Sequence, residues 1–240
     1  MWASSTRKWS CREGLKDRLC LAVFQGYLTL LERTVRMEFQ MYQVDGEGQK
    51  QICTHIHPEQ YTGIVGFWHE DSYTMNLILK EWNGAAGASA CLHREKNPGM
   101  QVVVTADKRG DYIEAMLNRY GASALRLGDG MRMRSGMKAL TDAANAAGSG
   151  LAVALDGPLG PRREPKKLAF FLAEEGEKRF SGVHLRYGGC LRLLRRWDHY
   201  AIPLPFTKIV VEIDDFGQIS KERLRKFPAL AGLAQNIMIG

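Results

Sequence analysis

The segment 151–163 joins an apolar run to charged residues that suit anion binding. It begins with Leu-Ala-Val-Ala-Leu, and Asp156 follows directly, before a Gly/Pro turn and the adjacent Arg162 and Arg163. A buried strand that ends in such a turn places charged groups at the carboxyl edge of a sheet, where open α/β folds bind ligands. Planar guanidinium groups suit phosphate or carboxylate. The segment therefore predicts an anion-binding loop, which includes Gly157.

A histidine follows an earlier apolar run, at 63–68. Histidine is the side chain best suited to proton transfer near neutral pH, so His69 is a candidate general base. Glu70, Asp71 or Thr74 would orient its ring. The alternative is an ordinary helix start, whose carboxylates interact favourably with the helix dipole. Because both runs are predicted strands followed by helices, we expect His69 at the same sheet edge as the Asp156 loop.

A third junction, at 126–136, is rich in arginine and glycine. Backbone amides at a helix start and guanidinium groups together can bind a phosphate, and the candidates are Arg126, Arg134 and Ser135. No Gly-Lys-Ser/Thr follows, and the glycine spacing is not that of a dinucleotide-binding loop. The alternative is a solvated basic turn.

Strand and helix patterns alternate along the part of the chain that holds these motifs. Apolar runs predict strands, and segments with a 3.6-residue period predict helices. The strands are expected at 37–44, 51–55, 63–68, 101–105, 122–127, 151–155, 183–187 and 208–213, and the last of these would close the sheet. Helices are expected at 19–39, 69–82, 110–120, 135–147 and 166–179. This order predicts an α/β fold with a mainly parallel or mixed central sheet and helices on both faces.

The chain divides into three parts by composition. Residues 1–36 are basic and contain an amphipathic helix, a composition typical of a segment that associates with a membrane surface. A frayed terminus is the alternative for its first twenty residues. Residues 37–219 form the predicted α/β domain, and 220–240 are predicted to be a short helix and a loosely held tail.

Bulk composition limits the class of protein. The 240 residues are 45% hydrophobic and 25% charged, which suits a globular protein with a core, and the net charge of +7 favours an anionic partner. The five cysteines are scattered, which argues against a disulfide framework or a zinc site. His55 and His57 would share one face of a strand, but no third ligand is evident, so no metal site is predicted.

These loops, followed by Trp-Asp-His-Tyr-Ala-Ile-Pro-Leu-Pro-Phe at 197–206, resemble a known family. It is the bacterial lysophospholipid acyltransferase-like family, first catalogued as a domain of unknown function and a branch of the glycerolipid acyltransferases. The resemblance covers about residues 20–216. The Asp-Gly-Pro-Leu-Gly-Pro-Arg block at 156–162 and the block at 197–206 are its most specific motifs.

The resemblance implies transfer of a fatty acyl group from a thioester to a hydroxyl of a lysophospholipid or related membrane lipid. In the superfamily a His-x4-Asp motif supplies the base, which matches His69, but the aspartate position falls on Thr74. Asp71 or Glu70 would then take the place of that aspartate. A Pro-Glu-Gly-Thr-Arg block corresponds to Asp156-Gly157-Pro158 with Arg162.

The predicted site follows from this resemblance and the residue chemistry together. The catalytic candidates are His69, Asp71 and Asp156. The candidates for binding a substrate phosphate are Arg126, Arg134, Ser135, Gly157 and Arg162.

The same resemblance implies the partners and the location. The acyl donor would be acyl-CoA or an acyl carrier protein, with no metal or other cofactor. The acceptor would be a lipid of an anionic membrane, at the cytoplasmic face of the inner membrane, with peripheral or monotopic attachment. One alternative is a non-catalytic lipid-binding protein with the same fold. A nucleic-acid-binding protein would also suit the charge, but the sequence contains no recognition motif, and no nucleic-acid partner is expected.

Overall fold

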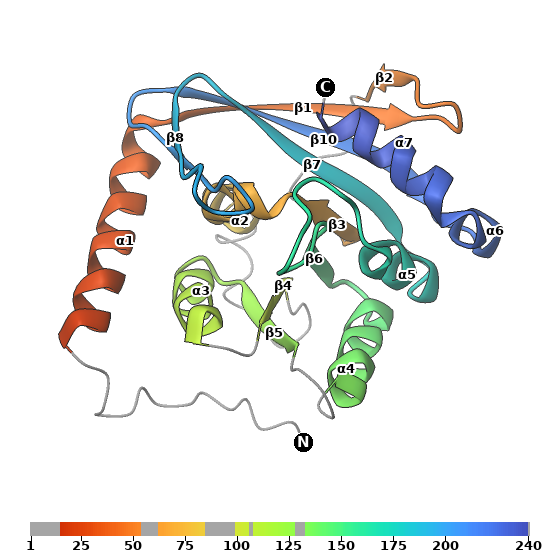
Figure 1. Ribbon diagram of the computed structural model, residues 1–240, viewed down its shortest axis with the longest axis horizontal. Coiled ribbons are helices and arrows are strands. Elements are labelled where there is room, and N and C mark those ends of the chain that lie inside the picture. The colour runs from red at the N-terminus through yellow and green to blue at the C-terminus, as the bar shows by residue number, and fades with distance from the viewer. Residues whose placement is uncertain (1–14, 54–61, 85–98, 106–107, 128–132, 240) are drawn as a thin grey trace.

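In the computed structural model the chain forms a central β-sheet with helices on both of its faces (Figure 1). The structure describes residues 15–53, 62–84, 99–105, 108–127 and 133–239. The α/β class predicted from the alternation of strands and helices is confirmed, as is a helix at the N-terminal side of the domain.

The described residues build an eight-stranded sheet with the order β2-β1-β10-β7-β3-β6-β4-β5. Five neighbouring strands, from β7 to β5, run parallel to one another, whereas β10 pairs antiparallel with β7 and parallel with β1. The strands are β1 (Arg36–Val44), β2 (Lys50–Ile52), β3 (Ile64–Phe67), β4 (Met100–Thr105), β5 (Ser123–Leu127), β6 (Gly150–Ala154), β7 (Arg179–Tyr187) and β10 (Lys208–Gln218).

Strands β3 and β6 lie in the middle of the parallel block and are buried on both faces. Their sequences, Ile-Val-Gly-Phe and Gly-Leu-Ala-Val-Ala, are continuous apolar runs, as expected of strands that are covered on both sides. Gly66 sits where a Cβ atom would lie 2.6 Å from Leu155 and 2.9 Å from Phe180. Only glycine therefore allows β3 this close an approach to its neighbours.

Helices cover the sheet in two layers, each with its own apolar core. Helices α1, α2 and α3 contribute to the core on one face, and α4, α5, α6 and α7 to the core on the other. The helices are α1 (Leu15–Thr34), the short 3-10 turn η2 (His69–Asp71), α2 (Ser72–Gly84), α3 (Lys108–Arg119), α4 (Met133–Asn145), α5 (Lys167–Glu175), α6 (Lys221–Arg225) and α7 (Phe227–Ile239).

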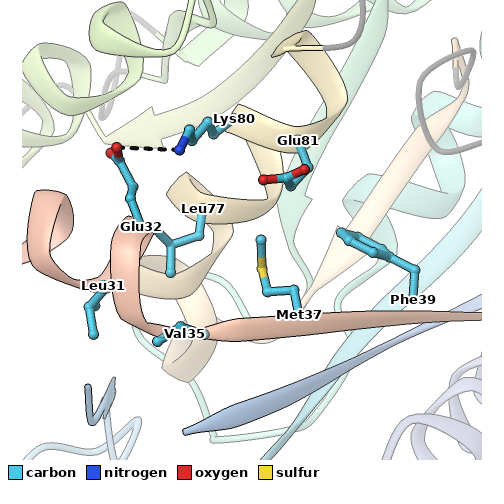
Figure 2. A pocket seen from close by; sticks show the side chains of 8 residues that line it. All are labelled: Leu31, Glu32, Val35, Met37, Phe39, Leu77, Lys80 and Glu81. Carbon is cyan, nitrogen blue, oxygen red and sulfur yellow. Dashed lines mark ion pairs between the residues drawn. The ribbon is translucent and has the colours of Figure 1, made fainter. Parts of the chain in front are cut away.

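Helix α1 is fixed to the domain by its buried face. Glu32 accepts a hydrogen bond from Tyr120, forms an ion pair with Arg119 and lies 3.4 Å from Lys80. A pocket with about 470 Å³ of empty space, open solvent included, lies between α1, β1 and α2, and Figure 2 shows the Glu32–Lys80 pair at its edge. Apolar residues such as Leu31 and Leu77 form part of the pocket wall.

Two sequence predictions about the C-terminal part are wrong. Strand β10 does not close the sheet, because β1 pairs with its outer side and β2 forms that edge. Residues 227–239 are not a loosely held tail but helix α7, which buries Leu230, Ala234 and Ile237. These residues repeat at intervals of four and three, the spacing of one helix face, so the pattern was present in the sequence.

A small hairpin between β7 and β10 was not predicted. Its strands are β8 (Cys190–Arg192) and β9 (Ala201–Pro203), which pair only with each other among the described residues. Strands of three residues are too short to show an alternating pattern. The hairpin contacts α2 and η2, and it lies over α2 in Figure 1.

Candidate active site

Two parallel strand ends bring the predicted histidine and aspartate loops together. Phe67 at the end of β3 is in register with Ala154 at the end of β6, so the residues that follow emerge side by side. The backbone N–H of His69 donates to Asp156 Oδ1 at 3.0 Å, and the N–H of Arg163 donates to Oδ2 at 3.2 Å. Asp156 thus joins the two loops through its carboxylate.

The environment of Asp156 makes its ionisation less favourable than that of an exposed aspartate. The side chain is completely buried, and this burial raises the pKa of Asp156 to about 6, although the backbone hydrogen bonds from His69 and Arg163 act in the opposite direction. Its contacts with His69 are through the backbone. Asp156 therefore positions the loop that carries the imidazole.

Glu70 is a buried carboxylate that binds three guanidinium groups. Arg162 Nε lies 2.6 Å from Oε2, Arg163 Nη2 lies 2.6 Å from Oε1, and Arg192 Nη1 lies 3.3 Å from Oε2. The glutamate is 1% exposed, whereas each arginine side chain remains 25–33% exposed. Three positive groups share one negative group here, so the cluster can accept a further anion from solvent.

Asp71 and Thr74 both contact the end of β7. The Tyr187 hydroxyl lies 2.8 Å from Asp71 Oδ1 and 3.0 Å from Thr74 Oγ1. Burial, and then the charge of Glu70, raises the pKa of Asp71 to about 7. The side chains of Glu70 and Asp71, which were expected to orient the imidazole, thus bind arginines and Tyr187 respectively.

The carboxylate that the structure brings to the imidazole ring is Asp198. Its Oδ2 lies 3.9 Å from His69 Nε2, and the Trp197 ring centre lies 5.4 Å from that of the histidine. Arg196 donates to both Asp198 oxygens, at 2.9 and 2.7 Å. Burial opposes ionisation of Asp198, but the hydrogen bonds and charge of Arg196 lower its pKa below the ordinary value. An ionised carboxylate therefore lies beside the imidazole.

Sequence reasoning missed this role of Asp198. The residue lies within the 197–206 block that carries the family resemblance, but it is far from His69 along the chain. The turn after β8 brings the two together, and that hairpin was not predicted. The Trp-Asp pair at the start of this block was the available signal.

A mostly apolar cavity begins at His69 and extends along the sheet edge. It encloses about 960 Å³ of empty space, its open mouth included. His69, Ser72, Asn76, Thr105 and Tyr200 are polar side chains in its wall. Most of the wall is apolar and comes from β4, β5, β6, α2, α3, α5 and the loop after β6, and it includes Met75, Leu79, Val102, Val104, Ile113, Met116, Leu117, Leu127, Ala152, Ala154, Pro158 and Leu168.

Gly157 contributes to the wall of this cavity but its amide is already engaged. Its N–H donates to the Ala154 carbonyl at 3.3 Å, and its φ of +66° is one that glycine adopts without strain. The turn therefore fixes the direction of the loop after β6. A developing oxyanion would need a donor other than this amide.

The predicted phosphate ligands after β5 are not brought to Glu70. Arg126 forms ion pairs with Asp111 and Glu114 of α3, at 2.8 and 2.5 Å, and donates to the Thr105 carbonyl. Ser135 is an exposed residue on α4. The side chain of Arg134, together with residues 128–132, lies outside the described part of the structure. Among the arginine candidates with described side chains, Arg162 is the one that the structure places next to the histidine loop, through its contact with Glu70.

No group of three or more His, Cys, Asp or Glu side chains suited to a metal ion occurs among the described residues. His55 and His57 lie outside those residues.

Comparisons of the chain with models of known protein families and with curated proteins found no match. The geometry of the site is therefore the basis for a functional assignment.

Proposed function

We propose that this protein is an O-acyltransferase that moves a fatty acyl group from an acyl thioester to a hydroxyl of a lysophospholipid or related membrane lipid. The observation that carries the proposal is the position of His69, at the wall of a mostly apolar cavity. A catalytic base beside a cavity with mostly apolar walls suits transfer of a fatty acyl group. The excess positive charge around Glu70 suits the phosphate of an acceptor or of coenzyme A.

The proposed reaction needs only proton transfer and electrostatic stabilisation. The imidazole of His69 takes the proton of the acceptor hydroxyl as its oxygen attacks the thioester carbonyl. Asp198 stabilises the imidazolium that forms. When the tetrahedral intermediate collapses, the carbon–sulfur bond breaks, the ester forms, and the thiolate takes the proton from His69. The products are the acylated lipid and a free thiol.

The exposed face of helix α1 and the charge of the chain support an anionic membrane as the source of the acceptor. Its buried face packs through Leu28 and Leu31, whereas Leu19, Val23 and Leu30 are 64%, 63% and 42% exposed on the other side. This exposed apolar stripe, together with the net charge of +7, suits a helix that lies at a membrane surface. No described helix combines the length and the hydropathy needed to cross a bilayer.

The test is release of free thiol by the purified protein. Acyl-CoA or acyl carrier protein is supplied with a panel of lysophospholipids, and thiol is measured with a chromogenic disulfide. The wild type is expected to release thiol only when donor and acceptor are both present, with the acylated lipid as co-product. His199→Asn is the matched control for a substitution of His69. His199 follows Asp198 directly in the chain and has no assigned role.

A non-catalytic lipid-binding protein is the second candidate. The observation that favours it is Thr74, which takes the place of the expected aspartate and is completely buried against Tyr187. This candidate predicts saturable binding of a fatty acid or lysolipid without thiol release from any donor. Turnover that depends on His69 would contradict it.

A further inference from the structure

The β8–β9 hairpin projects a short ordered tip between β7 and β10. Leu193 donates its N–H to the Tyr200 carbonyl at 3.0 Å, and Arg196 donates to the Leu193 carbonyl at 3.0 Å. These bonds hold residues 193–200 in a defined turn. The exposed groups of the tip therefore have fixed positions.

Apolar side chains are concentrated on this hairpin. Leu191, Leu193, Leu194 and Trp197 are 55%, 37%, 68% and 37% exposed. Single exposed apolar residues are common on protein surfaces. A run of several such residues within one turn, however, marks a surface that contacts a partner or a membrane.

Arginines lie among the leucines of the hairpin. Arg192 binds Glu70 and Arg196 binds Asp198, while Arg195 is exposed between Leu194 and Arg196. Leucine, tryptophan and arginine together form the composition of a membrane–water interface. The long arginine side chains can extend to lipid phosphates while the leucines enter the acyl region.

The hairpin borders the candidate active site. Trp197 lies against His69 and also against Gly160, where a Cβ atom would be 2.6 Å from the indole ring. Gly160 is next to Leu159, which is 90% exposed. The loop after β6 and the tip of the hairpin thus meet beside the histidine that lines the apolar cavity.

We propose that Leu159, Leu191, Leu194, Arg195 and Trp197 form a docking surface for an anionic lipid bilayer. This surface holds the histidine end of the cavity against the membrane, so that a lipid hydroxyl enters without crossing bulk water. The inference deepens the proposed function, since it rests on a membrane lipid being the acceptor. Docking itself requires no turnover and is tested separately.

Charge favours a bilayer over a second copy of this chain. In a symmetric dimer the same patch would face itself, so Arg195 of each copy would approach like charges. Anionic headgroups are instead attracted to these arginines and to the overall charge of +7.

The experiment measures binding of the full chain to vesicles of phosphatidylcholine, alone or mixed with phosphatidylglycerol, by flotation. The double variant Leu191→Gln/Leu194→Gln is expected to lower the partition coefficient by about tenfold or more, because two leucines no longer enter the bilayer. Arg195→Gln is expected to lower it by about fivefold on the anionic vesicles and to leave binding to phosphatidylcholine unchanged.

Matched controls come from the opposite part of the molecule. Ile52→Gln removes an apolar side chain that is 80% exposed on β2, and Arg225→Gln removes an exposed arginine on α6. Both are expected to bind vesicles like the wild type, and circular dichroism confirms that each variant is folded. Equal vesicle binding by Leu191→Gln/Leu194→Gln and Ile52→Gln would overturn the inference. It would also be overturned if the wild type were a dimer in solution, and the double variant became monomeric but still bound vesicles.

A soluble assay separates this inference from the proposed function. With a short-chain lysolipid below its micelle concentration, thiol release by the double variant should equal that of the wild type. Absence of thiol release together with hairpin-dependent vesicle binding would remove the acyl-transfer proposal and leave the docking surface in place. Thiol release without hairpin-dependent vesicle binding would remove the docking surface and leave the acyl-transfer proposal in place.

Discussion

Two histidine–carboxylate clusters among the described residues have opposite surroundings. His69 Nε2 lies 3.9 Å from Asp198, and its side chain, 26% exposed, forms part of a cavity wall. His184 Nε2 lies between two carboxylates on β10, 3.2 Å from Glu212 and 3.0 Å from Asp214. Its side chain is only 6% exposed and is not part of that wall.

The cations around His184 explain why its surroundings differ from those of His69. Lys50 Nζ lies 2.9 Å from Asp214 Oδ1, and Arg186 Nη2 lies 2.6 Å from Glu212 Oε1. These cations neutralise the charges of the two buried carboxylates, and His184 contacts both of them. The same residue types thus serve structure at β7 and β10 and suit proton transfer at the end of β3. The two histidines both have a nearby carboxylate, and they differ in that only His69 forms part of the cavity wall.

The largest expected effect comes from replacing His69 and His184 with glutamine in two separate variants. His69→Gln should lower the rate of thiol release by about 100-fold or more, because a general base contributes that much. Its thermal unfolding midpoint should change little, since the ring is partly exposed. His184→Gln should instead lower the free energy of unfolding by about 1–3 kcal/mol and leave the rate per folded molecule unchanged. Equal losses of activity in both variants would remove the distinction between the clusters.

Asp198→Asn tests the carboxylate beside His69. We expect a rate at least about tenfold lower with an unchanged KM, because a nearby negative charge stabilises the imidazolium. The acid limb of the pH–rate profile should move to lower pH, which a purely structural role would not cause. Asp214→Asn is the matched control and should leave the profile of folded protein unchanged. A profile of Asp198→Asn that coincides with the wild type would assign the residue to structure alone.

The sequence was sufficient for the parallel strands but not for the partners of their end residues. Continuous apolar runs identify β3 and β6, and parallel strand ends must share one edge, so the proximity of His69 and Asp156 could be expected. The partner of an individual carboxylate depends on side-chain packing between distant segments. That is why Asp71 binds Tyr187 and Glu70 binds arginines, although both lie within two residues of His69 in the chain.

Short elements and edge strands explain the other differences. The hairpin that carries Asp198 has strands of three residues, for which no periodic pattern exists. The position of β10 inside the sheet depends on its pairing with β1, and a strand pattern does not specify its neighbours. Helix α7 differs, because its apolar spacing was readable in the sequence.

The smallest expected effect concerns the pH dependence of stability, where Asp71 differs from an exposed aspartate. Its pKa is raised from 3.8 to about 7 by burial, so the folded state favours the neutral carboxyl. Stability from this group is fully present below the unfolded pKa and is lost as pH rises through the folded pKa, between about pH 4 and pH 7.

Asp71→Asn removes this dependence while its amide oxygen still accepts from Tyr187. At pH 8 the variant should be more stable than the wild type by about 1 kcal/mol or more, since one pKa unit corresponds to about 1.4 kcal/mol. At pH 4 the two should coincide. Urea unfolding at both pH values measures the difference, and Asp45→Asn in an exposed turn is the control. A gain at pH 8 no larger than that of the control would mean that the pKa of Asp71 is not raised in the folded protein, because the arginines around Glu70 offset the effect of burial.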